Sequence, residues 1–153
     1  MNRLCQNAVM LLIFLVLGCK AKRETGFYNY SKRGDLFRVP LIKPYEIISA
    51  DGTEWTYEVD SKNQLPISSI VEIGVKSNFF VIHSSNYYFN SHSGETWLIM
   101  DTRTGSKYFE TSDGSYDIQV RSLGIESIKL NSPSFLFQYL TNNGKMPGEW
   151  PDN

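Results

Sequence analysis

Two histidines are the residues of this chain best suited to acid–base or metal chemistry. His83 follows the apolar run Phe79–Ile82, and His92 lies in the polar stretch Asn90–Ser93. Serines beside both could complete a hydrolase, because an imidazole can act as general base for a nearby hydroxyl. No catalytic signature surrounds them, and their separation of nine residues matches no standard metal-ligand spacing. We therefore expect structural histidines and assign no catalytic residue, no metal ligand and no cofactor.

The only two cysteines, Cys5 and Cys19, lie near the amino terminus. Arg3 precedes an apolar run of ten residues, Ala8–Leu17. A membrane-spanning helix needs about 20 apolar residues, whereas a basic residue before a short apolar run is typical of a secretory signal. No cysteine follows Cys19, so the rest of the chain offers neither a disulfide nor a thiolate nucleophile.

The end of this leader, Val16-Leu17-Gly18-Cys19, resembles the lipobox of bacterial lipoproteins. The resemblance implies that residues 1–18 form a signal peptide, that cleavage precedes Cys19, and that Cys19 carries acyl chains such as palmitate. Two or more chains hold a protein stably on a bilayer, whereas one chain holds it only marginally. The implied location is the cell membrane or the outer membrane, with the protein in the periplasm or another extracytoplasmic space.

The composition indicates one folded domain without a strong electric field. The formal net charge is −1, with 15 basic and 16 acidic residues, so we expect no nucleic-acid partner. Aromatic residues make up 14% of the chain and can supply a well-filled core. Residues 19–35 are rich in charge and predict a lipidated tether, and residues 36–153 predict a single β-rich globular domain.

Alternating apolar and polar residues around turn residues predict three β-hairpins. Their strands are 36–50 with 55–59, 71–75 with 79–83, and 97–100 with 107–110. Pro40 and Pro44 make the first strand an edge strand or two short pieces, because proline cannot donate to a sheet. Asp51-Gly52, Ser77-Asn78 and the stretch Asp101–Gly105 supply the turns.

Two helices are predicted near the carboxyl end. Ser112-Asp113 can cap one that runs to about Ser122, and Ser132-Pro133 begins another that stops at Asn143-Gly144. A last strand is expected at 125–130. The fold class is thus α+β, mainly β: an antiparallel hairpin-built sheet or small open barrel with one or two C-terminal helices. We expect a single core made of Trp55, Val71, Ile73, Val81, Trp97, Ile99, Phe109, Leu136 and Leu140.

An aromatic cluster in the polar stretch Ser84–Gly94 is the best candidate for a binding surface. Rigid aromatic side chains flanked by small polar groups are typical of recognition loops. We therefore expect a loop here and predict Tyr87, Tyr88 and Phe89 as partner-binding residues. The alternative is that Tyr88 or Phe89 covers one end of the core.

The order of lipobox, tether, hairpins and C-terminal helix resembles small bacterial lipoproteins whose domains have no known function. This resemblance implies a location and a fold class but no active site. Our leading hypothesis is a non-catalytic binding or inhibitory, immunity-like domain, whose partners are the bilayer, through acylated Cys19, and another envelope protein or a toxin. The alternatives are a structural or accessory envelope lipoprotein and an envelope hydrolase using His83 and His92.

Overall fold

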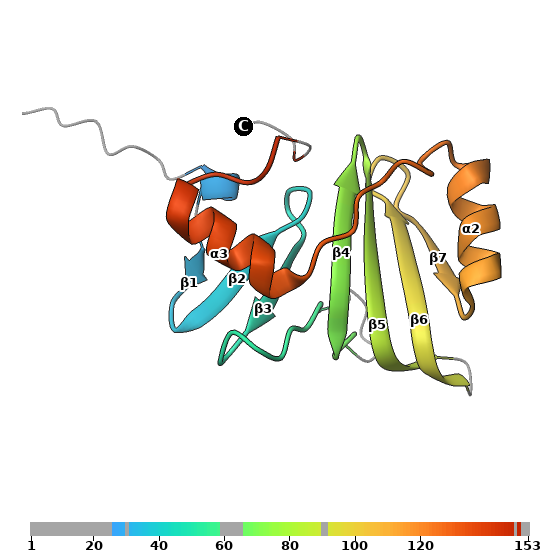
Figure 1. Ribbon diagram of the computed structural model, residues 1–153, viewed down its shortest axis with the longest axis horizontal. Coiled ribbons are helices and arrows are strands. Elements are labelled where there is room, and N and C mark those ends of the chain that lie inside the picture. The colour runs from blue at the N-terminus through green and yellow to red at the C-terminus, as the bar shows by residue number, and fades with distance from the viewer. Residues whose placement is uncertain (1–25, 30, 59–65, 90–91, 149, 151–153) are drawn as a thin grey trace, which may run out of the picture.

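The computed structural model describes residues 26–29, 31–58, 66–89, 92–148 and 150 (Figure 1). Within this part the fold is mainly β, with two antiparallel sheets and two α-helices, and the sheets do not close into a barrel. The predicted fold class is confirmed. The leader, including Cys19, lies outside the described residues.

The first sheet is small and has the order β1 (Lys32–Arg33), β2 (Leu36–Pro40), β3 (Glu46–Ser49). A short 3-10 helix, η1 (Phe27–Asn29), precedes it. Proline ends β2 and a second proline lies in the turn before β3, so the prediction of two short pieces is confirmed. The predicted return strand is reduced to isolated bridges, from Ile48 to Thr56 and from Tyr57 to Ile67.

The second sheet is a meander of four strands in chain order. They are β4 (Ile70–Lys76), β5 (Phe79–Phe89), β6 (His92–Asp101) and β7 (Ser106–Glu110). Ser77, at φ 54°, and Gly105, at φ 75°, supply the left-handed positions that tight hairpin turns need. Both predicted hairpins of this region are confirmed. The loop expected over 84–94 is wrong, because β5 continues to Phe89 and β6 begins at His92.

The two helices are α2 (Asp113–Ser122) and α3 (Pro133–Asn143). Both begin as predicted, since the side chains of Ser112 and Ser132 accept hydrogen bonds from the backbone of the first helical turn. Gly144, at φ 66°, ends α3 in the left-handed conformation.

The strand predicted at 125–130 is wrong, because this segment crosses over the face of β4 instead of extending a sheet. A Cβ atom on Gly74 would lie 2.6 Å from the carbonyl oxygen of Lys129. Only Asn131, directly after the segment, exchanges backbone hydrogen bonds with Ile73 at the edge of β4. Glycine in β4 therefore makes room for this crossing.

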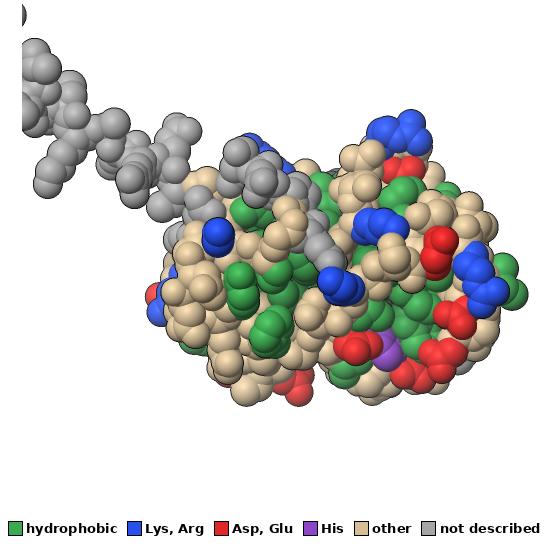
Figure 2. All heavy atoms as spheres, turned by 45° about the horizontal axis from the view of Figure 1, so that its top comes forward, with side chains coloured by type: hydrophobic (Ala, Val, Ile, Leu, Met, Phe, Trp, Pro, Cys, Tyr) green, Lys and Arg blue, Asp and Glu red, His purple; other side chains and the backbone are tan. Residues whose placement is uncertain are grey.

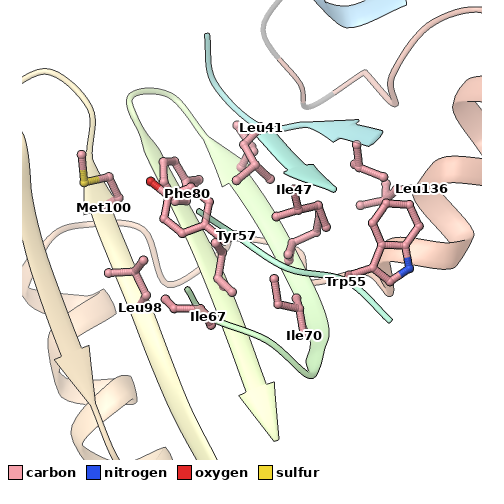
Figure 3. Close-up of a cluster of buried hydrophobic side chains, with 14 of the residues drawn as sticks. Leu41, Ile47, Trp55, Tyr57, Ile67, Ile70, Phe80, Leu98, Met100 and Leu136 are labelled. Atoms are coloured by element: carbon pink, nitrogen blue, oxygen red, sulfur yellow. The ribbon is translucent and has the colours of Figure 1, made fainter. Parts of the chain in front are cut away.

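The second sheet is packed on both faces, so the described part of the chain has two cores where one was expected. The main core lies between the two sheets and α3 and includes Trp55, Phe80 and Leu136 (Figure 3). The second core joins Val81 and Ile99 to α2. The expectation failed because α2 covers the face that a one-core arrangement leaves to solvent. Trp97 also belongs to the second core, and Val71 is 38% exposed.

Both ends of the described chain are held on β2 and the turn that follows it. The hydroxyl of buried Tyr28 accepts from the backbone N–H of Lys43. Near the other end, the indole N–H of buried Trp150 donates to the carbonyl oxygen of Pro40 at 2.7 Å. The folded structure therefore includes part of the segment 19–35 that the sequence predicted as tether.

Candidate functional site

A row of four polar and aromatic side chains crosses the second sheet from one edge to the other. Its members are direct partners on neighbouring strands: Glu72, His83, Trp97 and Glu110. Residues directly opposite each other in antiparallel strands point to the same face of the sheet. Glu95, two residues before Trp97 in β6, points to the same face, and we call these five residues the acidic row. It lies on the face that α2 partly covers.

His83 lies between two carboxylates. Its Nδ1 is 3.1 Å from an oxygen of Glu72, and its Nε2 is 2.9 Å from an oxygen of Glu95. Both nitrogens can donate at the same time only when the ring carries two protons. The His83 side chain is 12% exposed, whereas Glu72 is 45% and Glu95 58% exposed. The ring is thus sheltered, and the carboxylates reach solvent.

An aromatic stack fixes the position of this ring. His83 lies nearly parallel to Trp97, with ring centroids 4.3 Å apart, and Trp97 in turn stacks on Tyr116 of α2 at 5.6 Å. Burial raises the pKa of the Tyr116 phenol, and the negative charges of Asp117 and Glu72 raise it further. The stack on Trp97 therefore fixes the His83 ring that contacts both glutamates, and Tyr116 of α2 packs against Trp97 in turn.

Comparison with known proteins gives no match to this chain, because no protein-family model, no curated protein and no solved structure matches it. Across the residues that the structure describes, no helix is both long and apolar enough to cross a membrane. What the site does is argued below from its own chemistry.

The arrangement offers hydrogen-bond acceptors to a positively charged group. Each nitrogen of His83 already faces a carboxylate, so neither can act as a base or ligand unless that contact breaks. Among the described residues, no three His, Cys, Asp or Glu side chains are grouped to hold a metal ion. Exposed carboxylates in fixed positions are good acceptors for Lys and Arg. Figure 2 shows acidic side chains gathered over the lobe on the right, which contains the second sheet.

The structure does not support Tyr87 as a partner contact. Its side chain is 4% exposed and packs against Phe109 with ring centroids 6.3 Å apart, and burial raises the pKa of its phenol. The pairing of β5 with β6 shifts between Ser84 and Tyr87, and beyond this bulge Tyr87 packs in the main core. The side chains of Tyr88, Phe89 and His92 lie outside the described part, as does Cys19.

Sequence reasoning singled out His83 but missed the residues around it. A two-residue turn at Ser77-Asn78 fixes the register of its hairpin and places Glu72 opposite His83, so this pair could have been found. The approach of Glu95 and Tyr116 depends on how β6 and α2 pack on β5. Short-range sequence patterns carry no signal for such contacts.

Proposed function

We propose that this protein is a lipid-anchored, non-catalytic binding protein of the bacterial cell envelope that acts by inhibition in the manner of an immunity protein. It presents the acidic row to a basic surface of its partner. The single observation that supports this most is the bridge from Glu72 through His83 to Glu95, held on a rigid sheet.

The bridge lowers the entropy that binding must remove. Ordering a flexible side chain at an interface costs about 0.5–1.5 kcal/mol. Glu72 and Glu95 already share one ring, so part of their motion is restricted before a partner arrives. Each carboxylate can still accept further hydrogen bonds, because its two oxygens offer about four acceptor positions. A bound Lys or Arg would then meet acceptors that are already in place.

The same bridge argues against the hydrolase alternative for His83. A general base needs a free lone pair within hydrogen-bond reach of the proton that it removes. Here Nε2 and Nδ1 both point at carboxylates, and one ring face is covered by Trp97. Recruiting this histidine for catalysis would break two contacts and the stack.

The anchor is tested at Cys19, because the proposal includes attachment of acyl chains to that sulfur. Metabolic labelling with an alkyne palmitate should mark the wild-type chain, and Cys19→Ala should abolish the label and move the protein out of the membrane fraction. Cys5→Ala is the matched control and should label normally, since Cys5 lies in the leader. Equal labelling of the Cys19→Ala chain would contradict lipid anchoring.

The binding role is tested by capture from the envelope of the native host. A carboxyl-terminally tagged chain is crosslinked in cells, its partner is identified, and binding is repeated with the purified partner at several salt concentrations. Glu72→Gln combined with Glu95→Gln should weaken binding and flatten its salt dependence, because exposed charge pairs are screened by salt. The control, Glu54→Gln with Glu126→Gln, removes two other exposed carboxylates and should bind as wild type. Equal binding by all three proteins would contradict the proposal.

The identity of the captured partner separates inhibition from the accessory role. An immunity-like protein should neutralise a toxin, and a gene for that toxin is expected directly upstream. Adding the purified chain to the toxin should then abolish toxin activity, and the Glu72→Gln, Glu95→Gln variant should do so less well. Constitutive capture of a resident envelope protein, without inhibition, would favour the accessory lipoprotein instead.

A further inference from the structure

Helix α3 turns an uncharged aromatic face to solvent. One side of the helix buries Pro133, Leu136 and Leu140 in the main core. On the outer side Phe135 is 51% exposed, and its ring contacts that of Tyr139, one turn away, with centroids 6.2 Å apart. The helix contains no charged residue.

The other helix does not share this character. Ile118 of α2 is 69% exposed, but Asp117 precedes it and Arg121 follows within one turn. Bringing α2 against an apolar surface would therefore desolvate these charges, which is unfavourable for each buried ion. Aromatic rings without nearby charges are, by contrast, the side chains that settle at the interface between bilayer and water.

The outer face of α3 lies close to where the chain from the anchor enters the fold. Figure 1 shows η1, the short blue segment, beside the carboxyl end of α3. The contacts agree, because the end of β2 and the turn after it hold both Tyr28 of η1 and Trp150 in the tail that follows α3. Lys43, in that turn, and Lys145, just after α3, are exposed.

The length of the connecting chain brings the bilayer within reach of this face. Six residues lie between Cys19 and Gly26, and a fully extended chain covers at most about 25 Å from one to the other. Helix α3 has 11 residues and is therefore about 16 Å long. A short link of this kind gives a high effective concentration of membrane surface. Each nearby lysine adds electrostatic attraction when the lipids are anionic.

We propose that the outer face of α3, with Phe135 and Tyr139, rests on the surface of the bilayer that carries the Cys19 anchor. This inference deepens the proposed function and rests on its lipid anchor. In Figure 1 the two sheets lie side by side, α3 runs across the first sheet toward β4, and α2 lies at the end of the molecule beyond the second sheet. Helix α3 packs on the main core, whereas the acidic row lies on the opposite face of the second sheet, so the membrane contact does not involve the row.

The test uses the full acylated chain in vesicles of phosphatidylcholine and phosphatidylglycerol. Apart from acylated Cys19 the mature chain has no cysteine, so Gln138→Cys on the exposed side of α3 can carry a single fluorophore. Nitroxide-labelled lipid should quench this fluorophore several-fold more than one at Ile118→Cys on α2. Adding Phe135→Ser should reduce quenching at position 138. Adding Ile118→Ser, which removes an exposed apolar side chain from α2, should leave it unchanged.

Sedimentation of the same vesicles separates this inference from the anchor on which it rests. Protein that fails to sediment with them overturns both the anchor and the contact. Protein that sediments, but is quenched equally at positions 138 and 118, overturns the contact alone. A fluorophore at 138 that is shielded from aqueous iodide, yet not quenched by the labelled lipid, also overturns it and indicates a second copy of this chain on α3.

Discussion

Two buried tryptophans differ in one hydrogen bond. Trp55 is 1% exposed, and its indole nitrogen has no hydrogen-bond partner among the residues that the structure describes. Trp150 is 5% exposed and donates to the carbonyl oxygen of Pro40. A buried donor without an acceptor carries a desolvation cost of about 1–3 kcal/mol. The indole ring of Trp55 thus stabilises the fold by packing, and the desolvation of its N–H group reduces that stabilisation.

Phenylalanine substitutions at the two positions should therefore have unequal effects. Trp150→Phe removes a donor and leaves the Pro40 carbonyl oxygen unpaired, whereas Trp55→Phe removes an unsatisfied group. We expect Trp150→Phe to lower the free energy of unfolding by about 1–3 kcal/mol more than Trp55→Phe does. Urea denaturation of both variants measures the difference. Equal losses would show that the N–H groups do not matter and that only ring volume does.

Ile99 tests the second core. Its side chain is fully buried between β6 and α2, so Ile99→Ala should cost about 2–5 kcal/mol. Val71 was expected in the core as well but is 38% exposed, and Val71→Ala should cost less than about 1 kcal/mol. The melting temperatures of both variants test this difference. An unchanged melting temperature for Ile99→Ala would mean that α2 does not cover this face.

At the scale of elements, the crossing of residues 128–130 over β4 depends on a single glycine, Gly74. At Gly74 a Cβ would meet the backbone of Lys129 at 2.6 Å and side-chain atoms of Ile128 and Leu130 at 3.0 Å. Gly74→Ala should therefore destabilise the fold by about 1–3 kcal/mol, the usual cost of overpacking. Gly114→Ala is the control. That residue lies in α2 with no atom near the added Cβ, and alanine there should stabilise by about 0.5–1 kcal/mol. Equal effects in chemical denaturation would contradict the crossing.

The turn after β3 is held by a carboxylate. Asp51 accepts hydrogen bonds from the backbone N–H groups of Thr53 and Glu54 and from the hydroxyl of Ser49. These bonds, those from the Thr53 backbone first, hold the pKa of Asp51 well below its ordinary value. The stability that the charged form contributes is therefore fully present above the ordinary carboxyl pKa of about 4 and is lost as the pH falls below it.

Asp51→Asn should separate this charge effect from the shape of the turn, because asparagine can accept in the same geometry. We expect the wild type to be the more stable protein at neutral pH, and the difference to shrink as the pH falls from about 5 toward 2. Equilibrium unfolding at a series of pH values measures it. A difference that stays constant over this range would mean that the carboxylate is not charged in the turn.

Elements defined by neighbouring residues were predictable from the sequence. The caps at Ser112 and Ser132 and the turn at Ser77 are local devices, and the helices and hairpins they define are confirmed. The bulge between Ser84 and Tyr87 is not local. It depends on how β5 pairs with β6. The polar stretch that predicted a loop is therefore part of two paired strands, and Tyr87 is buried in the main core. Of the candidate site, only the pair of Glu72 with His83 followed from a turn.

At the scale of the whole molecule, the number of cores could not be read from alternating residues. Alternation shows that two faces of a strand differ, but not whether a later segment will cover the second face. In this chain α2 and residues 125–130 do so, and Val81, Trp97 and Ile99 become buried on the opposite side from Phe80 and Leu98. Helix α2 therefore serves twice, as cover for the second core and as support for the aromatic stack within the acidic row.

Strand β5 contributes to both cores, because its side chains alternate between them. Its backbone pairs with β4 on one side and with β6 on the other. A local fluctuation can expose one face of this strand while the other face and both ladders stay closed. Its amide hydrogens are therefore released to solvent only when the entire chain opens. In deuterated buffer the amides of Val81 and Ile82 should be among the last to exchange. Their rate then measures the global stability of the fold directly, without any denaturant.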